Sequence, residues 1–534
     1  MTNRDNPAVN PEINPYDETP YTSFPFKYTR PEHLRAVGML FGMNPPEVET
    51  ARVLELGCSS GGNIIGFAST FPKAKVIGVD LSNVQIEEGK QIIKALGLKN
   101  IELKAMSIID IDKSFGMFDY IISHGVLSWV PEVVRSKILE ISKTHLSPQG
   151  IAYISYNTLP GWNMARTTRD MMQFHSALFG DIKDQVAQSR LFLNFVKDAL
   201  AGTQSPYEKF LEAEAGHLQN QSDYYLRHEH LSPENTQFYF HEIVDMAKKQ
   251  GLTYLSDTNV ASMYIGNLPE KARSKLSAIT DIVRAEQYMD FINNRRFRCS
   301  LLCHDNVALN RSINSTVLDK MLISVNVTAE KALSDASLLD SSESLSFYIN
   351  DNKESAISTS SPIMKAILYA CAESNGYPTS PKALAKDATK KLKNVTSDAV
   401  KAEIDNNMPL LLLRGMINVV PNLPTYINTI SSKPKVSDLV RFQASKDNAI
   451  VATNQVNDAV SINIVDRFAL RYLDGKNTIE QIVDKLIESH VKSGDLVIKE
   501  GETPITDAKV LKSRLQEALL QCIESYRKNC LLVG

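Results

Sequence analysis

Short apolar runs alternate with helical repeats along the first third of the chain, from residue 51 to residue 155. Each run has the length of one strand and is bounded by glycine, proline or polar residues, which is typical of buried strands. Between the runs, apolar residues such as Ile86, Ile93 and Leu96 recur at helical spacing. Strands are expected over residues 51–56, 75–80, 101–106, 118–123 and 151–155. Strands that alternate with helices predict a parallel sheet covered on both faces, that is, a doubly wound α/β fold.

A long helical stretch interrupts this alternation after the fifth strand. Amphipathic helical patterns begin at Gly161 and continue to about Gln221, and a further helix is expected over 236–250. Two more apolar runs, at 252–255 and 297–303, bring the predicted sheet to seven strands. The expected core is therefore a Rossmann-like domain over residues 46–310, with a helical insertion at about 161–235.

The two ends of the chain differ from this core. Residues 1–45 hold seven prolines interleaved with aromatic residues, a pattern that predicts an extended arm. Two roles for the arm stay open: it ties domains together, or it forms a lid over a ligand. Residues 311–534 mix short helices with short apolar runs, which predicts one or two small α+β modules of winged-helix-like type. There we expect helices over 362–372, 381–392, 462–473, 479–488 and 507–527, and β-rich pieces over 345–349, 410–420 and 449–454.

Composition and charge limit the classes of function. The chain has 534 residues, with 58 Lys and Arg against 61 Asp and Glu, and a formal charge of -3. Proteins held to nucleic acid by its phosphates carry a basic excess, so no nucleic-acid partner is expected. No apolar run approaches the roughly 18 residues that span a bilayer, and the polar N-terminus has no secretory signal, so we expect a cytoplasmic protein without membrane insertion.

Cysteine usage gives no indication of a metal site. Six cysteines in a chain of this kind are expected to be reduced thiols. Cys299, Cys303 and His304 approach a metal-ligand spacing, but no second Cys/His pair lies nearby. We expect these residues to pack in a strand, and no metal is predicted.

The residues that carry chemistry lie where the first strand meets the first helix. The segment Glu55-Leu56-Gly57-Cys58-Ser59-Ser60-Gly61-Gly62-Asn63 forms a glycine-rich turn, and Asp80 ends the second strand. A carboxylate at that strand end accepts hydrogen bonds from ribose hydroxyls. A dinucleotide site would need GxGxxG to seat a pyrophosphate, and Glu55 beside the turn would repel that group. The acid instead suits a ligand with an ammonium and a sulfonium, which is S-adenosylmethionine; a turn without any ligand is the remaining alternative.

These motifs are similar to those of a known family. Residues 52–157, with ELGCSSGGN, Asp80 and FDYIISHGVLSWVP, resemble class I S-adenosylmethionine-dependent methyltransferases. YDETPYTSFPF, SYNTLPGWN, YYLRHEHLSPENTQFYFHEI and EQYMDFINNRRFRCSLLCH resemble the members that carry a methyltransferase regulatory region. Within that group the chain looks most like the rickettsial protein lysine methyltransferases, which methylate outer membrane protein B.

The resemblance implies a set of cofactor contacts. Glu55, Gly57, Cys58 and Gly61 would line the methionine and ribose side, and Asp80 would bind the ribose. Leu81, Ser107 and Ile108 would face the adenine, and His124 and Gly125 would face the methionine end. Ser59 stands where many class I enzymes have a middle glycine, and serine is tolerated there if its φ stays negative.

The acceptor and the oligomeric state are predicted less directly. A lysine amine with a pKa of about 10.4 must lose a proton before it attacks, and desolvation and the nearby sulfonium charge favour that loss. Aromatic walls would hold the methylated ammonium by cation–π attraction. Tyr16, Tyr21, Trp129, Tyr156 and Trp162 are the candidate walls, and core packing is the alternative for each. His124 would be a cofactor neighbour or a proton acceptor. The helices over 166–201 are a candidate homodimer interface, and packing within one chain is the alternative.

Three functions are weighed. The first is a protein lysine N-methyltransferase that acts on accessible lysines of a bacterial surface protein before export and releases S-adenosylhomocysteine. The second is a small-molecule methyltransferase gated by its C-terminal region. The third is a cofactor-binding scaffold without turnover. The absence of an Asn/Asp-Pro-Pro-Tyr/Phe motif after the fourth strand disfavours a nucleic-acid base as acceptor.

Overall fold

A seven-stranded mixed sheet forms the centre of the protein in the computed structural model, which describes residues 17, 23–333, 337–501 and 503–534. The strand order is β3-β2-β1-β4-β5-β7-β6, and β7 alone runs antiparallel to its two neighbours within this sheet. The strands are β1 (Arg52–Leu56), β2 (Lys75–Asp80), β3 (Ile101–Ala105), β4 (Phe118–Ser123), β5 (Leu146–Asn157), β6 (Leu252–Asp257) and β7 (Phe297–His304). The prediction of a seven-stranded, Rossmann-like doubly wound core is confirmed.

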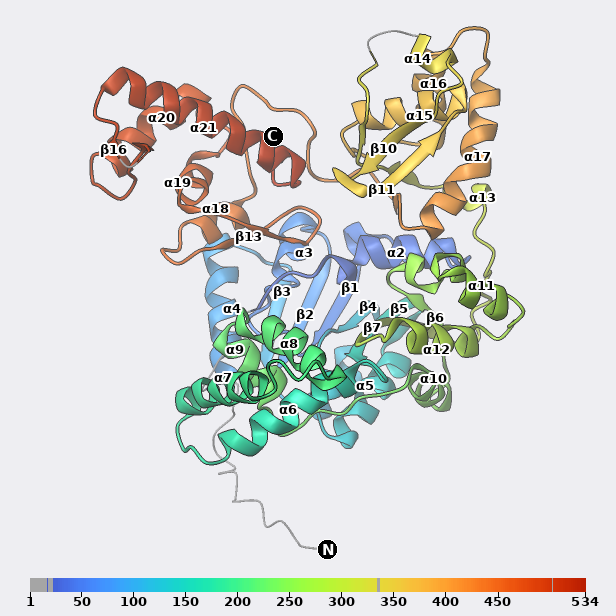
Figure 1. The fold of residues 1–534 in the computed structure, drawn as a ribbon, viewed down its shortest axis with the longest axis vertical. Helices are drawn as coiled ribbons and strands as arrows, with labels where there is room; N and C mark the ends of the chain where they lie inside the picture. Colours follow the sequence, from blue (N-terminus) through green and yellow to red (C-terminus); the bar gives the residue numbers. More distant parts are fainter. Residues whose placement is uncertain (1–16, 18–22, 334–336, 502) are drawn as a thin grey trace, which may run out of the picture.

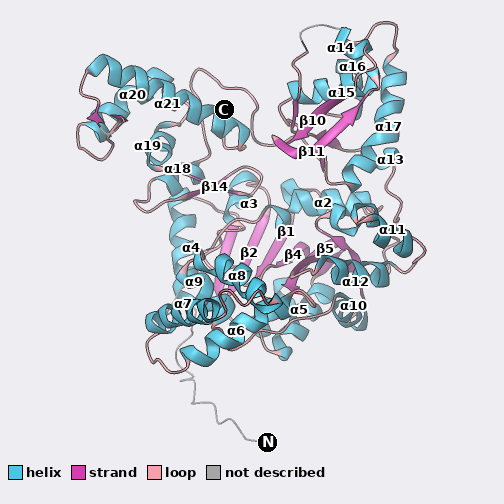
Figure 2. Ribbon diagram, in the orientation of Figure 1, coloured by secondary structure: helices cyan, strands magenta, loops and turns pink. Residues whose placement is uncertain are grey.

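Helices cover both faces of this sheet (Figure 2). Side chains of α2 (Pro31–Leu40), α3 (Ile65–Thr70) and α4 (Asn83–Leu96) pack in the core on one face. Those of α5 (Glu132–Thr144) and α10 (Phe240–Lys249) pack in the core on the other. Because both faces are covered, the central strands are buried almost throughout, which explains their continuous apolar runs.

The helical insertion has a small core of its own. It comprises α6 (Trp162–Ser176), α7 (Ile182–Ala199) and α8 (Pro206–Gln219), followed by the short α9 (Asp223–Tyr225) and one turn of π-helix. Buried apolar residues such as Met172, Leu193 and Leu211 hold the three long helices together. The helix expected from residue 236 begins four residues later, where Tyr239 caps α10. After α10, α11 (Glu270–Leu276) and α12 (Ile282–Asn293) lead into β7.

The C-terminal half forms two modules that lie on the opposite side of the sheet from the insertion (Figure 1). The first combines a three-stranded antiparallel sheet with three long helices, and the second combines two antiparallel strand pairs, β13-β14 and β15-β16, with four helices. The first contains α13 (Ser315–Leu318), β8 (Leu322–Ser324), β9 (Val327–Ala329), α14 (Ser337–Asp340), β10 (Leu345–Ile349), β11 (Asn352–Thr359), α15 (Pro362–Glu373), α16 (Pro381–Thr389), α17 (Ser397–Leu413) and β12 (Asn418–Val420). The second contains α18 (Asp438–Ala444), β13 (Val451–Thr453), β14 (Ala459–Ser461), α19 (Ile464–Tyr472), α20 (Ile479–Leu486), β15 (Lys499–Glu500), β16 (Thr503–Pro504) and α21 (Ala508–Lys528).

One expectation for this half is wrong. Residues 410–420 were expected to be β-rich, but α17 continues through Pro409 to Leu413, and only β12 is a strand. Leu411 and Leu412 are both buried, so this run of leucines forms the buried last turn of a helix. An apolar run of this length does not distinguish a buried strand from a buried helix.

The strand order fixes where a ligand meets the sheet. β1 lies between β2 and β4, and the order reverses between β1 and β4. In open α/β sheets, ligands bind in the crevice outside the carboxyl ends of the strands at this switch point. The loops after β1, β2 and β4, which hold Glu55 to Asn63, Asp80 and His124, therefore share one edge of the sheet.

Candidate active site

The loop after β1 makes a tight turn against the end of β2. The amides of Gly57 and Cys58 both donate to the carbonyl of Val79, at 2.8 and 3.1 Å. Gly57 has a φ of 75°, and a Cβ there would lie 2.5 Å from Cγ2 of Val126, so only glycine fits this position. The sequence placed the glycine-rich turn correctly, and the turn brings Cys58 and Gly61 to the same edge of the sheet.

Ser59 adopts a conformation that the sequence did not predict. Its φ is 51°, in the left-handed region, so the condition of a negative φ at this serine is not met. The turned peptide directs the Ser59 amide at Oδ2 of Asp80, 2.8 Å away. The left-handed conformation costs about 1–2 kcal/mol in a residue with a side chain, and the hydrogen bond to a carboxylate offsets it.

Asp80 joins the loop to the end of β2. Its second oxygen, Oδ1, accepts a hydrogen bond from the Ser82 amide at 2.9 Å. Burial raises the pKa of Asp80, and the nearby charge of Asp17 raises it further. A carboxylate has about four acceptor sites, so two amides leave capacity for further hydroxyl donors. This is the arrangement that ribose binding requires.

Asp17 is a member of this group that the sequence did not single out. The Ser82 hydroxyl donates to Oδ1 of Asp17 at 2.5 Å. The residue lies in the segment YDETPYTSFPF of the N-terminal arm. Tyr16 and Tyr21 of the same segment lie outside the described residues.

Glu55 is a buried acid with one unused oxygen. It is 2% exposed, and its Oε1 accepts from Nδ2 of Asn63 at 2.7 Å. Oε2 has no hydrogen-bond partner among the described residues. Burial raises the pKa of Glu55 to about 8, the Asn63 bond lowers it, and the charge of Asp80 raises it again. A buried, half-satisfied carboxyl group is costly unless a cationic donor completes it, so the site fits the amino group of S-adenosylmethionine.

The residues predicted to face adenine follow neighbouring strand ends. The amide of Met106 donates to the carbonyl of Asp80 at 2.9 Å, which brings the segment after β3 beside the segment after β2. Leu81 is 63% exposed and offers an apolar surface to a flat ring. Ser107 caps a short 3-10 helix, Ile108–Asp110, through the Ile109 amide.

His124 and Gly125 follow β4, and the ring of Phe26 in the N-terminal arm stacks on His124. Burial lowers the pKa of His124 to about 4, so its ring is neutral at pH 7. Nδ1 lies 2.8 Å from the Tyr153 hydroxyl, and the Gly125 amide donates to Oγ of Ser155 at 2.7 Å. A histidine with so low a pKa is poorly suited to accept a proton at neutral pH, which favours its role as a cofactor neighbour.

The arm passes directly over the glycine-rich loop. The Gly62 amide donates to Oγ of Ser23 at 2.8 Å, and the Phe26 amide donates to Oδ1 of Asn63 at 3.0 Å. A Cβ on Gly62 would lie 2.4 Å from the carbonyl oxygen of Ser23. Glycine is therefore required at position 62 by the close approach of the arm.

The three candidate aromatic walls do not share one environment. Trp129 and Trp162 meet edge to face, with 6.4 Å between ring centroids, and Nε1 of Trp162 is buried without a partner among the described residues. Tyr156 packs in the core on the sheet face that α5 and α10 cover. Its hydroxyl is hydrogen-bonded to the Ser300 hydroxyl at 2.9 Å. Tyr156 is 1% exposed and packs in the core, which is the alternative given for it.

The insertion holds a titratable group that sequence reasoning missed. Glu229 lies in the π-helix Leu226–His230, and burial raises its pKa to about 7, against the opposing charge of Arg169. Burial lowers the pKa of the neighbouring His230 to about 3. Single π-helical turns are frequent at functional sites. The sequence His228-Glu229-His230 does not by itself predict a π-helical turn or a buried acid.

The cysteines near β7 are strand residues. Cys299 and Cys303 are buried in the sheet, and the Tyr153 hydroxyl donates to Sγ of Cys299 at 3.1 Å. His304 contacts the carbonyl of Leu146 at 3.0 Å. Within the part of the chain that the structure describes, no group of three His, Cys, Asp or Glu side chains is arranged to hold a metal ion. The helices of that part include none with the length and apolar character to cross a bilayer.

Three families match parts of the chain. Residues 53–150 match a methyltransferase domain, residues 222–304 match a predicted methyltransferase regulatory domain, and residues 432–531 match the C-terminal winged helix domain of PKMT (protein lysine methyltransferase). The third match covers most of the second C-terminal module, which confirms its winged-helix character.

Relatives match over almost the whole length. An uncharacterized protein of Rickettsia prowazekii is 48% identical over 97% of this chain and 94% of that protein. The structure of PKMT2 from Rickettsia typhi is 43% identical, with a TM-score of 0.88, over 96% of this chain and 100% of that chain. The same protein in complex with AdoHcy (S-adenosylhomocysteine) is 44% identical over the same shares, with a TM-score of 0.89. The chain is an S-adenosylmethionine-dependent methyltransferase and belongs to the family of Rickettsia typhi PKMT2.

Proposed function

We propose that the protein transfers methyl groups to lysine side chains of a surface protein of the outer membrane protein B type, before that protein is exported. The likeness to PKMT2 over 96% of the chain, winged helix module included, is the observation that carries the proposal. The segments that resemble rickettsial lysine methyltransferases support the choice of substrate.

The cofactor-binding residues are proposed from their chemistry. When bound, S-adenosylmethionine supplies a methyl group on a sulfonium, and its transfer leaves S-adenosylhomocysteine. Glu55 would accept from the amino group through Oε2, which has no other partner among the described residues. Asp80 would accept from the ribose hydroxyls, and Leu81, Ser107 and Ile108 would border the adenine. Gly57, Cys58, Gly61, His124 and Gly125 would line the methionine side.

The neutral state of His124 suits an amine acceptor. A lysine ammonium must lose its proton before its nitrogen attacks, and a nearby positive charge or low-dielectric surroundings favour that loss. His124 is neutral because of its burial, so it adds no fixed charge that would repel the sulfonium. The paired rings of Trp129 and Trp162 would desolvate the lysine stem and attract a methylated ammonium by cation–π interaction.

A homodimer through the insertion is part of the proposal. Four large apolar side chains on α6, α7 and the turn between them are each more than half exposed: Phe174, Leu178, Leu191 and Phe195. Contiguous exposed apolar surface on a globular protein marks an interaction site. We propose a second copy of the chain as its occupant, because identical patches pair around a two-fold axis.

The experiment that tests the function uses methyl-labelled S-adenosylmethionine. The protein is incubated with purified fragments of outer membrane protein B, and the fragments are digested and mapped by mass spectrometry. Label on lysine is the expected result. Label confined to another residue type, or S-adenosylhomocysteine release only with added small molecules, would contradict the proposal.

A further inference from the structure

A turn of the winged helix module inserts beside the cofactor loop. It joins β13 to β14 and carries Asn457, which has a φ of 58° and is 4% exposed. Asparagine tolerates this left-handed conformation better than most residues. The Asn457 amide donates to the carbonyl of Asn454 at 3.1 Å, and Oδ1 of Asn454 accepts from the amides of Val456 and Asp458 at 3.0 and 2.8 Å. The turn therefore presents the Asn457 side chain in a fixed direction.

The side chain of Asn457 fixes the orientation of Asn63. Its Nδ2 lies 3.0 Å from Oδ1 and 3.1 Å from the carbonyl oxygen of Asn63. Oδ1 of Asn63 also accepts from the Phe26 amide and the Thr29 hydroxyl, at 3.0 and 2.9 Å. Because three donors converge on one end of the Asn63 amide, that end must be the oxygen. The NH2 end then points at Glu55 as a donor.

These contacts form one chain of hydrogen bonds from the winged helix module to the buried acid. Nδ2 of Asn63 donates to Oε1 of Glu55 at 2.7 Å, and this bond leaves Oε2 directed elsewhere, without a partner among the described residues. We propose that Asn457 is a positioning residue for cofactor binding, which orients the Asn63 amide and, through it, the Glu55 carboxylate. The inference rests on the role proposed above for Glu55.

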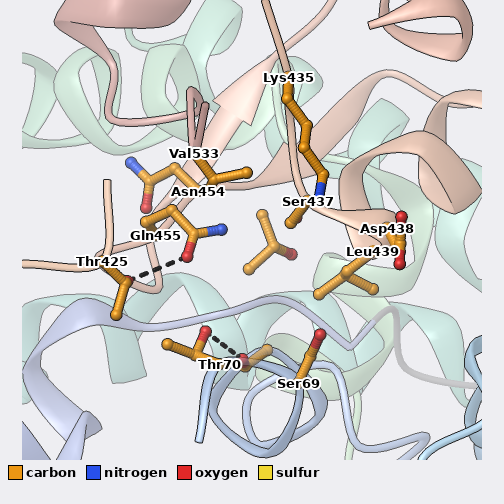
Figure 3. Close-up of a pocket in the computed structure, with 12 residues that line it drawn as sticks. Ser69, Thr70, Thr425, Lys435, Ser437, Asp438, Leu439, Asn454, Gln455 and Val533 are labelled. Atoms are coloured by element: carbon orange, nitrogen blue, oxygen red, sulfur yellow. Dashed lines mark hydrogen bonds between the residues drawn. The ribbon is translucent and has the colours of Figure 1, made fainter. Parts of the chain in front are cut away.

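Beside this turn, Leu439 of α18 packs in the core of the sheet domain, and a cavity of about 250 Å³ lies between α3 and the winged helix module (Figure 3). Hydroxyl and amide groups line it, among them Ser69, Thr70 and Gln455. The ion pair of Lys27 and Asp458 beside the turn is exposed and adds little rigidity. A Cβ on Gly66 would lie 3.3 Å from Oδ1 of Asn457, so α3 presents its smallest residue where the side chain enters. The buried Asn457 contact is thus a directional polar link between the two parts.

The test measures cofactor affinity in the full-length protein. Asn457→Gly removes the side chain but keeps the turn, because glycine accepts the positive φ. Calorimetry should give a Kd for S-adenosylmethionine about fivefold to tenfold higher, the effect of one or two lost hydrogen bonds. The KM for the cofactor should rise equally, and kcat at saturating cofactor should stay within about twofold. Asp458→Asn, in the same turn, should leave the Kd unchanged.

A second, near-isosteric variant is needed because glycine at position 457 could loosen the turn and raise the Kd for that reason alone. Asn457→Asp keeps the shape but replaces the donor with an acceptor that faces Oδ1 of Asn63, so the Kd should rise at least as much as in Asn457→Gly. An unchanged Kd in a folded Asn457→Asp protein, as judged by its melting transition, would overturn the inference.

A double-mutant cycle tests whether Asn457 acts through Asn63. In the Asn63→Ala background, Asn457→Gly should have no further effect on the Kd, because residues that act through one bond are not additive. Full additivity would overturn the inference. Glu55→Gln separates the two proposals: an unchanged Kd in that variant rejects the role of Glu55, whereas a raised Kd with no effect of Asn457→Gly rejects only the role of Asn457.

Discussion

The ring of Phe26 stacks on the imidazole of His124, with 4.3 Å between ring centroids and 20° between the ring planes. Phe26 belongs to the N-terminal arm, and His124 follows β4 at the switch point of the sheet. The contact therefore joins the arm to the candidate active site. It also contributes to the burial that lowers the pKa of His124 to about 4.

Removal of this contact should change the titration of His124. In Phe26→Ala, water reaches the imidazole, so its pKa should rise from about 4 toward the ordinary 6.5. Carbon-13 labelled histidine and NMR would follow the titration, with His124→Gln identifying the signal. Phe24→Ala is the matched control, because Phe24 is an exposed ring of the same arm. A midpoint that stays near 4 in Phe26→Ala would show that the arm does not bury the ring.

The protonation state of Glu55 should make cofactor binding pH-dependent. Its pKa of about 8 means that the free protein holds Glu55 protonated at pH 7, whereas an ammonium ligand favours the carboxylate. Binding must therefore release a proton, and affinity should rise with pH from about 6 to 8. Two other groups near Glu55 titrate, Asp80 and Cys58, and burial raises the pKa of both. If Asp80 also loses a proton when the cofactor binds, that loss likewise makes affinity rise with pH.

Calorimetry in buffers of different ionisation enthalpy measures the released proton directly. At pH 7 the wild-type protein should release up to about one proton per bound cofactor through Glu55. Glu55→Gln should bind more weakly and release fewer protons. Equal proton release in both proteins would assign the proton to another group.

The sequence predicted the sheet and the loop but not the contacts between distant segments. Strands with both faces buried and a glycine-rich turn with Asp80 downstream are local patterns, and each was recognised. The positive φ of Ser59 was missed because it depends on the position of Asp80 across the turn. The sequence left core packing open for Tyr156, because alternation along β5 does not say which sheet face borders a ligand.

Asn457 shows the limit of such reasoning most clearly. It lies 394 positions from Asn63 along the chain, and an asparagine in a hairpin turn is ordinary turn chemistry. Nothing in the local pattern connects it to a loop in another domain. The packing of the winged helix module against α3 creates the contact, and only the three-dimensional structure contains that information.

Asp80→Ala should weaken cofactor binding by about 1–3 kcal/mol, because two hydroxyls lose their acceptor. Part of this loss would come from the loop, since Asp80 also holds the amides of Ser59 and Ser82. Asp80→Asn separates the contributions, because it keeps the shape and one acceptor oxygen. Its Kd by calorimetry should lie between those of Asp80→Ala and the wild type. Unchanged affinity in Asp80→Ala would contradict the assigned site.

The apolar patch on the insertion predicts the oligomeric state. Phe195 lies on α7 and stacks on Phe192 at 6.3 Å, yet it is largely exposed, as are Phe174 and Leu178. If a second copy covers this patch, Phe195→Asp places a charge in an apolar interface and should convert the dimer to monomers. Light scattering on the size-exclusion eluate measures the mass, 59.5 kDa for one chain.

The control also replaces an exposed apolar side chain with aspartate, but at a position outside the insertion. Ile450 is as exposed as the patch residues but lies on the winged helix module, so Ile450→Asp should leave the dimer intact. The monomeric Phe195→Asp protein should keep the cofactor affinity of the wild type, because α7 contributes none of the residues proposed to hold the cofactor. A wild-type protein of monomer mass at micromolar concentration would reject the dimer, and the exposed rings of α6 and α7 would then require a different partner.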